Sequence, residues 1–493
     1  MSTAGKQILS VASVATVARL LGPDAYGVMG MANLLIVFIL NFRDMGTGTA
    51  IIQRLEVSDR LLSSLFWVNF FLGILMAAVI TGASPFAAQF FHTPELIPIL
   101  CTLSISFWLA SCGVVHRSLL MRGMDFKALA AVDLLSALAS YVVALAFAYT
   151  GFGVWSLVFA NIAMSLASTL GYWMASTWRP GMEFDREAVR AITNFSLNLS
   201  GFGVVNYFSR NADNITVGRV LGKTLLGDYQ MAYNLMLQPI QNISQVIGQV
   251  TLPAFAKIQD ENERFRFAYV KSCMLIALIT FPVMAGLGIV AHPLIDAVLG
   301  PKWSGAIRIF EILAAVGLVQ SVQTTVGQIY IAKARTDYMF RFGLVSCVIL
   351  VIAFITGVKF GTVGVATAYA ITYLGILMIP GFIIPFRLIG LKLSSFGSAM
   401  LPQLLITGGM TLVCWMWLRL LDSMVVMNPW TRLVSTSLLG AVVYICACIL
   451  LWPPVMRHLE EVIEVSTGGR LSGYLSTARR FSMKRFAMRG TVQ

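Results

Sequence analysis

The chain has 493 residues, of which 58% are hydrophobic and only 12% are charged, and its mean hydropathy is +0.80. A soluble domain carries about 25% charged residues, so this composition excludes a soluble globular protein and predicts one whose solvent is the lipid bilayer. The net charge of +13 could suggest a nucleic-acid partner. However, the Lys and Arg residues lie between apolar segments and do not cluster with aromatic side chains, so we expect no nucleic-acid partner.

Apolar segments long enough to cross a bilayer as helices recur along the whole chain. Fourteen spans are predicted, at residues 5–21, 28–52, 62–84, 95–119, 128–150, 152–174, 195–221, 226–256, 270–291, 306–331, 339–358, 362–386, 398–420 and 430–452. With the N-terminus placed in the cytoplasm, 25 of the 35 basic residues fall on the cytoplasmic side, in agreement with the positive-inside rule. The predicted fold class is therefore an all-α integral membrane protein with fourteen transmembrane helices and both termini in the cytoplasm.

The sequence of residues 16–35 reappears at 216–235, where nine of the twenty positions are identical at a constant offset. Duplicated helix bundles are a common architecture of transporters. Both copies start from the same side of the membrane, so the repeat is parallel. The predicted parts are a first six-helix lobe, a cytoplasmic linker, a second six-helix lobe, two further helices and a basic cytoplasmic tail, at 1–174, 175–194, 195–386, 387–453 and 454–493.

Two arginines and four glycines are common to both copies of the repeat. Arg19 and Arg219 each precede Leu-Gly at a helix end, where a basic side chain complements the helix dipole or reaches lipid headgroups. We therefore expect a structural role for these arginines. The shared glycines are predicted to form the tight turn between the first two helices of each lobe, and they are Gly22, Gly27, Gly222 and Gly227.

Charged and amide side chains inside the spans are the candidates for the lining of a lumen, because charge within a span usually faces a cavity or a partner. Arg210 and Asp213 are three residues apart, so they share a helix face and could pair. The eighth span carries amides at spacings of three and four, which form one polar stripe. The predicted lumen residues are Arg43, Asp44, Arg210, Asp213, Asn234, Gln238, Asn242, Gln245 and Gln249. For any single amide, a hydrogen bond between two helices is the alternative.

Four segments carry a resemblance to a known family. They read ARLLGPDAYGVMGMANLL at 18–35, GDYQMAYNLMLQPI at 227–240, TLPAFAKIQDENERFRFAYVK at 251–271 and VLGPKWSGAIRIFEIL at 298–313. With these segments the chain resembles the polysaccharide-transport branch of the multidrug/oligosaccharidyl-lipid/polysaccharide exporter superfamily. It is most similar to the Wzx-type flippases of exopolysaccharide pathways of the colanic-acid and succinoglycan kind.

The resemblance implies two lobes around a central cavity, a multi-pass protein of the bacterial inner membrane, and alternating access. The implied substrate is an undecaprenyl-pyrophosphate-linked oligosaccharide, moved from the inner to the outer leaflet, with membrane lipids and a polysaccharide polymerase or co-polymerase complex as partners. No bound cofactor is implied. Coupling to Na⁺ or H⁺ occurs in the superfamily, and the acids available for it here are Asp44, Asp133, Asp213 and Glu311.

Three other functions remain as alternatives. A drug or small-cation exporter of the same superfamily should favour acids and aromatic side chains, whereas Arg43, Arg210 and the amide stripe favour an anionic substrate that carries sugars. A membrane polymerase, ligase or glycosyltransferase would need an extramembrane domain, a metal-binding acidic cluster or a large exterior loop, so no enzymatic activity is expected. A structural subunit without transport should tolerate replacement of the luminal arginines.

Overall fold

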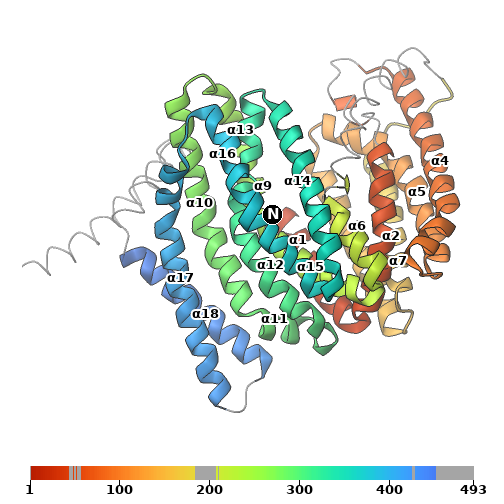
Figure 1. The fold of residues 1–493 in the computed structure, drawn as a ribbon. Coiled ribbons are helices and arrows are strands. Elements are labelled where there is room, and N and C mark those ends of the chain that lie inside the picture. Colours follow the sequence, from red (N-terminus) through yellow and green to blue (C-terminus); the bar gives the residue numbers. More distant parts are fainter. Residues whose placement is uncertain are drawn as a thin grey trace, which may run out of the picture. The chain divides into compact units, whose positions relative to one another are not determined.

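In the computed structural model, the described residues are 2–43, 48, 51–52, 57–183, 207–208, 210–424 and 428–450. Only the backbone is described at 2–11, 41–43, 245–246 and 249–250. These parts of the chain form helices joined by short turns and contain no strand, which confirms the all-helical class (Figure 1). The predicted basic tail at 454–493 lies outside the described residues.

Helices in the first half of the chain follow the predicted spans. They are α1 (Ser2–Leu21), α2 (Pro23–Arg43), α4 (Asp59–Phe91), α5 (Leu96–Arg122), α6 (Phe126–Tyr149) and α7 (Trp155–Ala175). Polar side chains cap two of the starts, since Ser58 accepts a hydrogen bond from the Leu61 amide at 3.2 Å and Asp125 accepts one from the Ala128 amide at 3.0 Å. These caps explain why α4 and α6 begin where they do.

The second half starts with a helical run over 210–221 and continues with further helices. They are α9 (Lys223–Lys257), α10 (Asn262–Ile289), α11 (Ala291–Val298), α12 (Ser304–Gln323), α13 (Val326–Ala332), α14 (Thr336–Gly357), α15 (Gly361–Ile371), α16 (Met378–Ile389), α17 (Leu393–Ser423) and α18 (Pro429–Leu450). Gly361, the first residue of α15, has a φ of +76°, a conformation that favours glycine, and it lies between two predicted spans.

Ten helical stretches within the described ranges are long and apolar enough to cross a membrane. One of them, Thr336–Ile389, has 54 residues and covers two predicted spans. Helix α9 has sufficient length at 35 residues, but its amide side chains lower its hydropathy, and α1 is strongly apolar only over Ala12–Leu21. The chain is therefore a multi-pass membrane protein, and the number of fourteen spans stays a prediction.

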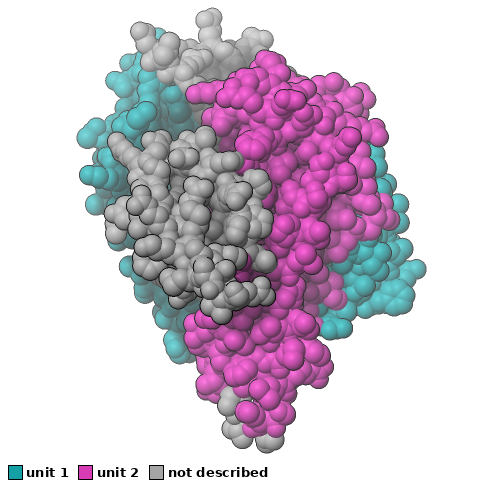
Figure 2. Space-filling model, turned by 90° about the vertical axis from the view of Figure 1, so that its left-hand side faces the viewer, with its two compact units in different colours: residues 1–234, 295–310, 343–372 teal, residues 235–294, 311–342, 373–493 magenta. Residues whose placement is uncertain are grey.

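Contacts between helices divide the chain into two compact units (Figure 2). The first unit comprises 1–234, 295–310 and 343–372, and the second comprises 235–294, 311–342 and 373–493. In the first unit α5 packs against α4 and α7, while α6 packs against α7 and α1. In the second unit α17 packs against α10 and α18. Each unit takes segments from both halves of the sequence, and the predicted lobe boundaries stay a prediction.

An aromatic cluster forms the core of the second unit. Its fully buried members include Phe255, Phe265, Tyr269 and Phe386, with ring centroids of neighbours 4.9–6.2 Å apart. Such ring pairs add stability beyond the area that they bury. In the first unit, the start of the predicted linker is held on α4 instead. There the Trp67 indole donates to the Gly181 carbonyl at 2.9 Å.

Candidate functional site

The two copies of the repeat meet within the first unit, where α2 and α9 begin. A Cβ atom on Gly27 would lie 1.8 Å from the Lys223 carbonyl oxygen, and one on Gly227 would lie 2.1 Å from the Pro23 carbonyl oxygen. Each glycine thus meets the first residue of the other helix, so the contact is pseudo-symmetric. We call this contact of α2 and α9 the helix crossing. Only glycine lets two backbones approach this closely.

The four shared glycines therefore have two different roles. Gly22 and Gly222 have φ angles of +84° and +85°, and they occupy the turns that precede α2 and α9. Gly27 and Gly227 lie within helices and not in the turn in which the sequence predicts them. The reason is that a repeat conserves a residue for packing between its copies as readily as for a turn, and the sequence pattern does not distinguish the two.

Polar contacts join the same end of the two copies. The Thr224 hydroxyl donates to the Asp24 carboxylate, although these residues are 200 positions apart in the sequence. Lys223 pairs with Glu95 at 3.0 Å, which links the start of α9 to the turn before α5. A pair that is this exposed contributes little stability by itself. The pair shows instead that the start of α9 and the turn before α5 lie at the same end of the first unit.

The repeated arginines contact helix ends at the same place. The Arg19 guanidinium donates to the Ala297 carbonyl at 2.7 Å, in the last turn of α11. The Arg219 guanidinium lies 2.7 Å from Nε2 of His92, which caps the C-terminus of α4. A positive charge at a helix C-terminus is favourable because it opposes the negative end of the dipole. Both arginines thus occupy positions that suit a structural role.

Trp303 completes this end of the first unit. Its indole is fully buried and donates to the Ala18 carbonyl at 2.9 Å, and its ring meets the edge of Tyr26 at a centroid distance of 5.4 Å. The neighbouring Lys302 donates to the Leu20 carbonyl at 2.9 Å. Sequence reasoning used the segment around Trp303 only for its resemblance to a family. The available signal was a Lys-Trp pair at 302–303, two residues after the turn glycine Gly300, which has a φ of +90°.

Asp213 lies inside the first unit and not on an open surface. Its carboxylate accepts hydrogen bonds from the Asn214 amide at 2.7 Å and from the Tyr229 hydroxyl at 3.1 Å. Arg210, three residues earlier, is exposed. Three residues turn a helix by about 300°, which leaves roughly 60° between the two side chains. At this separation Asp213 is buried and contacts Tyr229, whereas Arg210 is exposed.

The polar stripe of α9 is present on the described part of that helix. Asn234, Gln238 and Asn242 are all exposed, at the spacing that puts them on one face. A helix of membrane-spanning length does not leave a row of amides in contact with lipid, because unpaired polar groups are costly in hydrocarbon. The side chains of Gln245, Gln249 and Arg43 are not described, and Asp44 lies outside the described residues. That these residues line a lumen stays a prediction.

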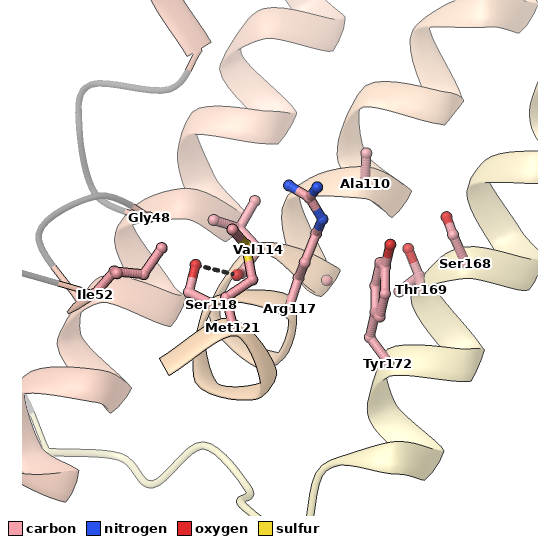
Figure 3. Close-up of a pocket in the computed structure, with 11 residues that line it drawn as sticks. Gly48, Ile52, Ala110, Val114, Arg117, Ser118, Met121, Ser168, Thr169 and Tyr172 are labelled. Carbon is pink, nitrogen blue, oxygen red and sulfur yellow. Dashed lines mark hydrogen bonds between the residues drawn. The ribbon is translucent and has the colours of Figure 1, made fainter. Parts of the chain in front are cut away.

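A cavity of about 280 Å³ lies in the first unit, between α5, α7 and residues 48 and 52 (Figure 3). Its polar lining consists of Arg117, Ser118, Ser168, Thr169 and Tyr172. Sequence reasoning missed this cavity because it counted Arg117, near the end of the predicted span 95–119, only as a basic residue on the cytoplasmic side. The signal that could have found it is the position of this arginine five residues before the end of an apolar helix. Among the described residues, no group of three or more His, Cys, Asp or Glu side chains is arranged to hold a metal ion.

Comparison with known proteins identifies the family. A family model described as "Polysaccharide biosynthesis protein" matches residues 16–308. The chain belongs to this family. Curated relatives of this polysaccharide biosynthesis protein include the lipopolysaccharide biosynthesis protein WzxC of Escherichia coli (strain K12), which is 28% identical over 73% of this chain and 74% of the relative. The teichuronic acid biosynthesis protein TuaB of Bacillus subtilis (strain 168) is 27% identical over 86% of this chain and 88% of TuaB. The succinoglycan biosynthesis transport protein ExoT of Rhizobium meliloti (strain 1021) is 26% identical over 64% of each chain.

Solved structures show the fold of this family member. The lipid II flippase MurJ in an inward closed conformation matches with a TM-score of 0.71 and 16% identity, over 92% of this chain and 98% of MurJ. An inward-facing multidrug resistance MATE family transporter of the MOP superfamily matches with a TM-score of 0.63 and 15% identity, over 78% of this chain and 94% of the transporter. These matches and the relatives confirm the resemblance that the four sequence segments indicate.

Proposed function

We propose that the protein flips an undecaprenyl-pyrophosphate-linked oligosaccharide repeat unit from the inner to the outer leaflet of the bacterial inner membrane, for exopolysaccharide synthesis. Two of its relatives are named for lipopolysaccharide biosynthesis and for succinoglycan transport, and its fold is that of a lipid II flippase. The observation that carries the proposal is α9, which has the length to cross a membrane and exposes a row of amides.

The polar stripe suits the head of such a substrate. A sugar–pyrophosphate head cannot enter hydrocarbon without partners for its polar groups. Amides both donate and accept hydrogen bonds, so Asn234, Gln238 and Asn242 can replace the water around sugar hydroxyls. Arginine fits phosphate oxygens, and Arg43 and Arg210 are our candidates for the pyrophosphate. The apolar lipid tail would remain in the bilayer while the head passes.

The helix crossing can act as the exterior gate that alternating access requires. In the proposed topology the turns at Gly22, His92, Gly222 and Gly300 each follow an odd-numbered span, so all four face the exterior. The contacts among these turns within the first unit support their placement on one side of the membrane, since turns on opposite sides could not touch. We propose that the helix crossing closes the exterior end while the substrate loads from the cytoplasm, and that it separates for release.

Energy coupling and partners are further parts of the proposal. Na⁺ or H⁺ would couple through a membrane acid, for which Asp133 and Asp213 are the described candidates with hydrogen-bonded carboxylates. Glu311 and Asp44 are the other two acids. A polysaccharide polymerase or co-polymerase complex would receive the flipped repeat unit. A drug exporter is the second candidate function, because a MATE transporter shares the fold.

A deletion strain tests the proposed function. Lipid-linked oligosaccharide in membrane extracts and secreted polymer would be quantified with and without the restored gene. The proposal predicts that complete repeat units accumulate and that polymer is lost when the gene is absent. Unchanged lipid and polymer pools, in a strain without a second flippase gene, would contradict it and favour an assay of drug export.

A further inference from the structure

We infer that the cavity around Arg117 binds the phosphate group of a membrane lipid at the cytoplasmic interface. Helix α5 has 27 residues and is therefore about 40 Å long, which matches a bilayer with its headgroups. Arg117 lies five residues before the end of α5, about 7.5 Å along its axis. In the proposed topology this end faces the cytoplasm. The depth of the arginine is thus that of the boundary between hydrocarbon and lipid phosphates.

Arg117 supplies the positive charge of the site. Its side chain is exposed, and its guanidinium extends into the space between α5 and α7 toward the level of the Thr169 and Tyr172 hydroxyls (Figure 3). The guanidinium presents parallel N–H donors that fit two oxygens of one phosphate. A charge at this depth usually faces a cavity or a partner, and here it faces a cavity of about 280 Å³.

Hydroxyl groups on the wall can turn toward an anion at little cost. The Ser118 hydroxyl donates to the Val114 carbonyl at 2.9 Å, and the Thr169 hydroxyl donates to the Leu109 carbonyl at 2.8 Å. Both carbonyls lie inside α5, where each also accepts the amide of the next helical turn. Either hydroxyl can therefore rotate its hydrogen to a phosphate oxygen without leaving the carbonyl unpaired.

Asp133 on α6 sets the charge balance of the site. The Tyr172 hydroxyl donates to the Asp133 carboxylate at 2.7 Å, which fixes the ring on the cavity wall. Both Asp133 and Arg117 are within electrostatic reach of that hydroxyl. The carboxylate therefore offsets part of the arginine charge. It follows that neutralising Asp133 should strengthen the binding of an anion, whereas neutralising Arg117 should weaken it.

Two lipids carry the required chemistry, an anionic glycerophospholipid and undecaprenyl pyrophosphate, which is the carrier of the proposed substrate. Only the second source rests on the proposed function. The test uses purified full-length protein in detergent, with phosphatidylglycerol or undecaprenyl pyrophosphate added, and native mass spectrometry of the bound lipid. The variants are R117Q, R117K and D133N. The matched control is R60Q, which removes one charge from the exposed first turn of α4, outside the cavity.

For at least one of the two lipids, R117Q should weaken binding about tenfold or more, since charge-assisted hydrogen bonds are lost. R117K should retain part of the affinity, D133N should bind more tightly than the native protein, and R60Q should stay within about twofold of it. The lipid that responds identifies the source. Equal binding by R117Q and the native protein, or weaker binding by D133N, would overturn the inference.

Thermal unfolding without added lipid shows whether each variant is folded. If R117Q does not fold, D133N and R117K still test the inference. The assay measures binding alone. A protein that binds lipid at Arg117 but does not flip the lipid-linked oligosaccharide would therefore refute the proposed function and leave the site intact.

Discussion

Replacing Gly27 with alanine should destabilise the protein, because the helix crossing has no room for a methyl group. The added carbon would lie 1.8 Å from the Lys223 carbonyl oxygen and 2.6 Å from its carbonyl carbon. Carbon and oxygen atoms approach to about 3.3 Å at closest in ordinary contacts, so α2 and α9 would have to separate by about 1.5 Å. The clash is with backbone, which cannot rotate away as a side chain would.

The expected cost follows from this geometry. Extra methylene groups in a packed interior cost about 1–3 kcal/mol, and a clash with backbone should reach the upper end, about 3 kcal/mol. Gly227→Ala should cost a similar amount, since its Cβ would lie 2.1 Å from the Pro23 carbonyl oxygen. The two changes open the same contact, so the double variant should lose less stability than the sum of the single losses.

Thermal unfolding in detergent, followed with a thiol-reactive fluorophore, measures the effect. The buried Cys273 and Cys414 react only when the chain unfolds. The control is Gly343→Ala on α14, where a Cβ would meet nothing within 4 Å and alanine favours the helix by roughly 0.5–1 kcal/mol. We expect G27A to unfold several degrees below G343A and to export less polymer. Equal unfolding temperatures for the two variants would refute the close approach of α2 and α9.

Three further changes test other parts of the account. Cysteines in place of Asp24 and Thr224 in a cysteine-free background should crosslink and block polymer export until reductant is added, because the helix crossing must open. Export through the intact crosslink would show that this end does not move. Asp213→Asn should lower the free energy of unfolding by about 1–3 kcal/mol, since one of the two buried oxygens that accept from the Asn214 backbone amide and the Tyr229 hydroxyl becomes an NH₂ donor, and an unchanged melting temperature would contradict that role. Gln238→Leu should reduce export at matched protein levels while Gln238→Asn retains most of it. Equal export by these two variants would show that the Gln238 amide does not take part in transport.

The helices of this protein could be predicted from its sequence because the apolar length of a segment is a local property. Asp125 is an example, since its place before an apolar run indicates a helix start, and it caps α6 in the structure. Helix α9 could be predicted in spite of its amides because the repeat aligns it with α2. The amide stripe itself follows from spacing alone, and Gln238 is exposed where that spacing puts it.

The contacts of the site could not be predicted, because they join residues that are far apart in the sequence. The repeat marks Gly27 as important, but only the structure shows that it meets Lys223 and does not form a turn. Asp213 shares a helix with Arg210, yet its hydrogen-bond partner is Tyr229 on α9. The cavity at Arg117 depends on how α5 and α7 pack, which no pattern within either helix specifies.

Flipping by the purified protein tests the central claim most directly. The protein would be reconstituted into liposomes that contain undecaprenyl-pyrophosphate-linked oligosaccharide in both leaflets, and a membrane-impermeant glycosidase would be added outside. The account predicts that the protected inner-leaflet half becomes accessible over time, and that the crosslinked cysteine variant at Asp24 and Thr224 keeps it protected. A protected fraction that persists as in liposomes without protein would contradict the account.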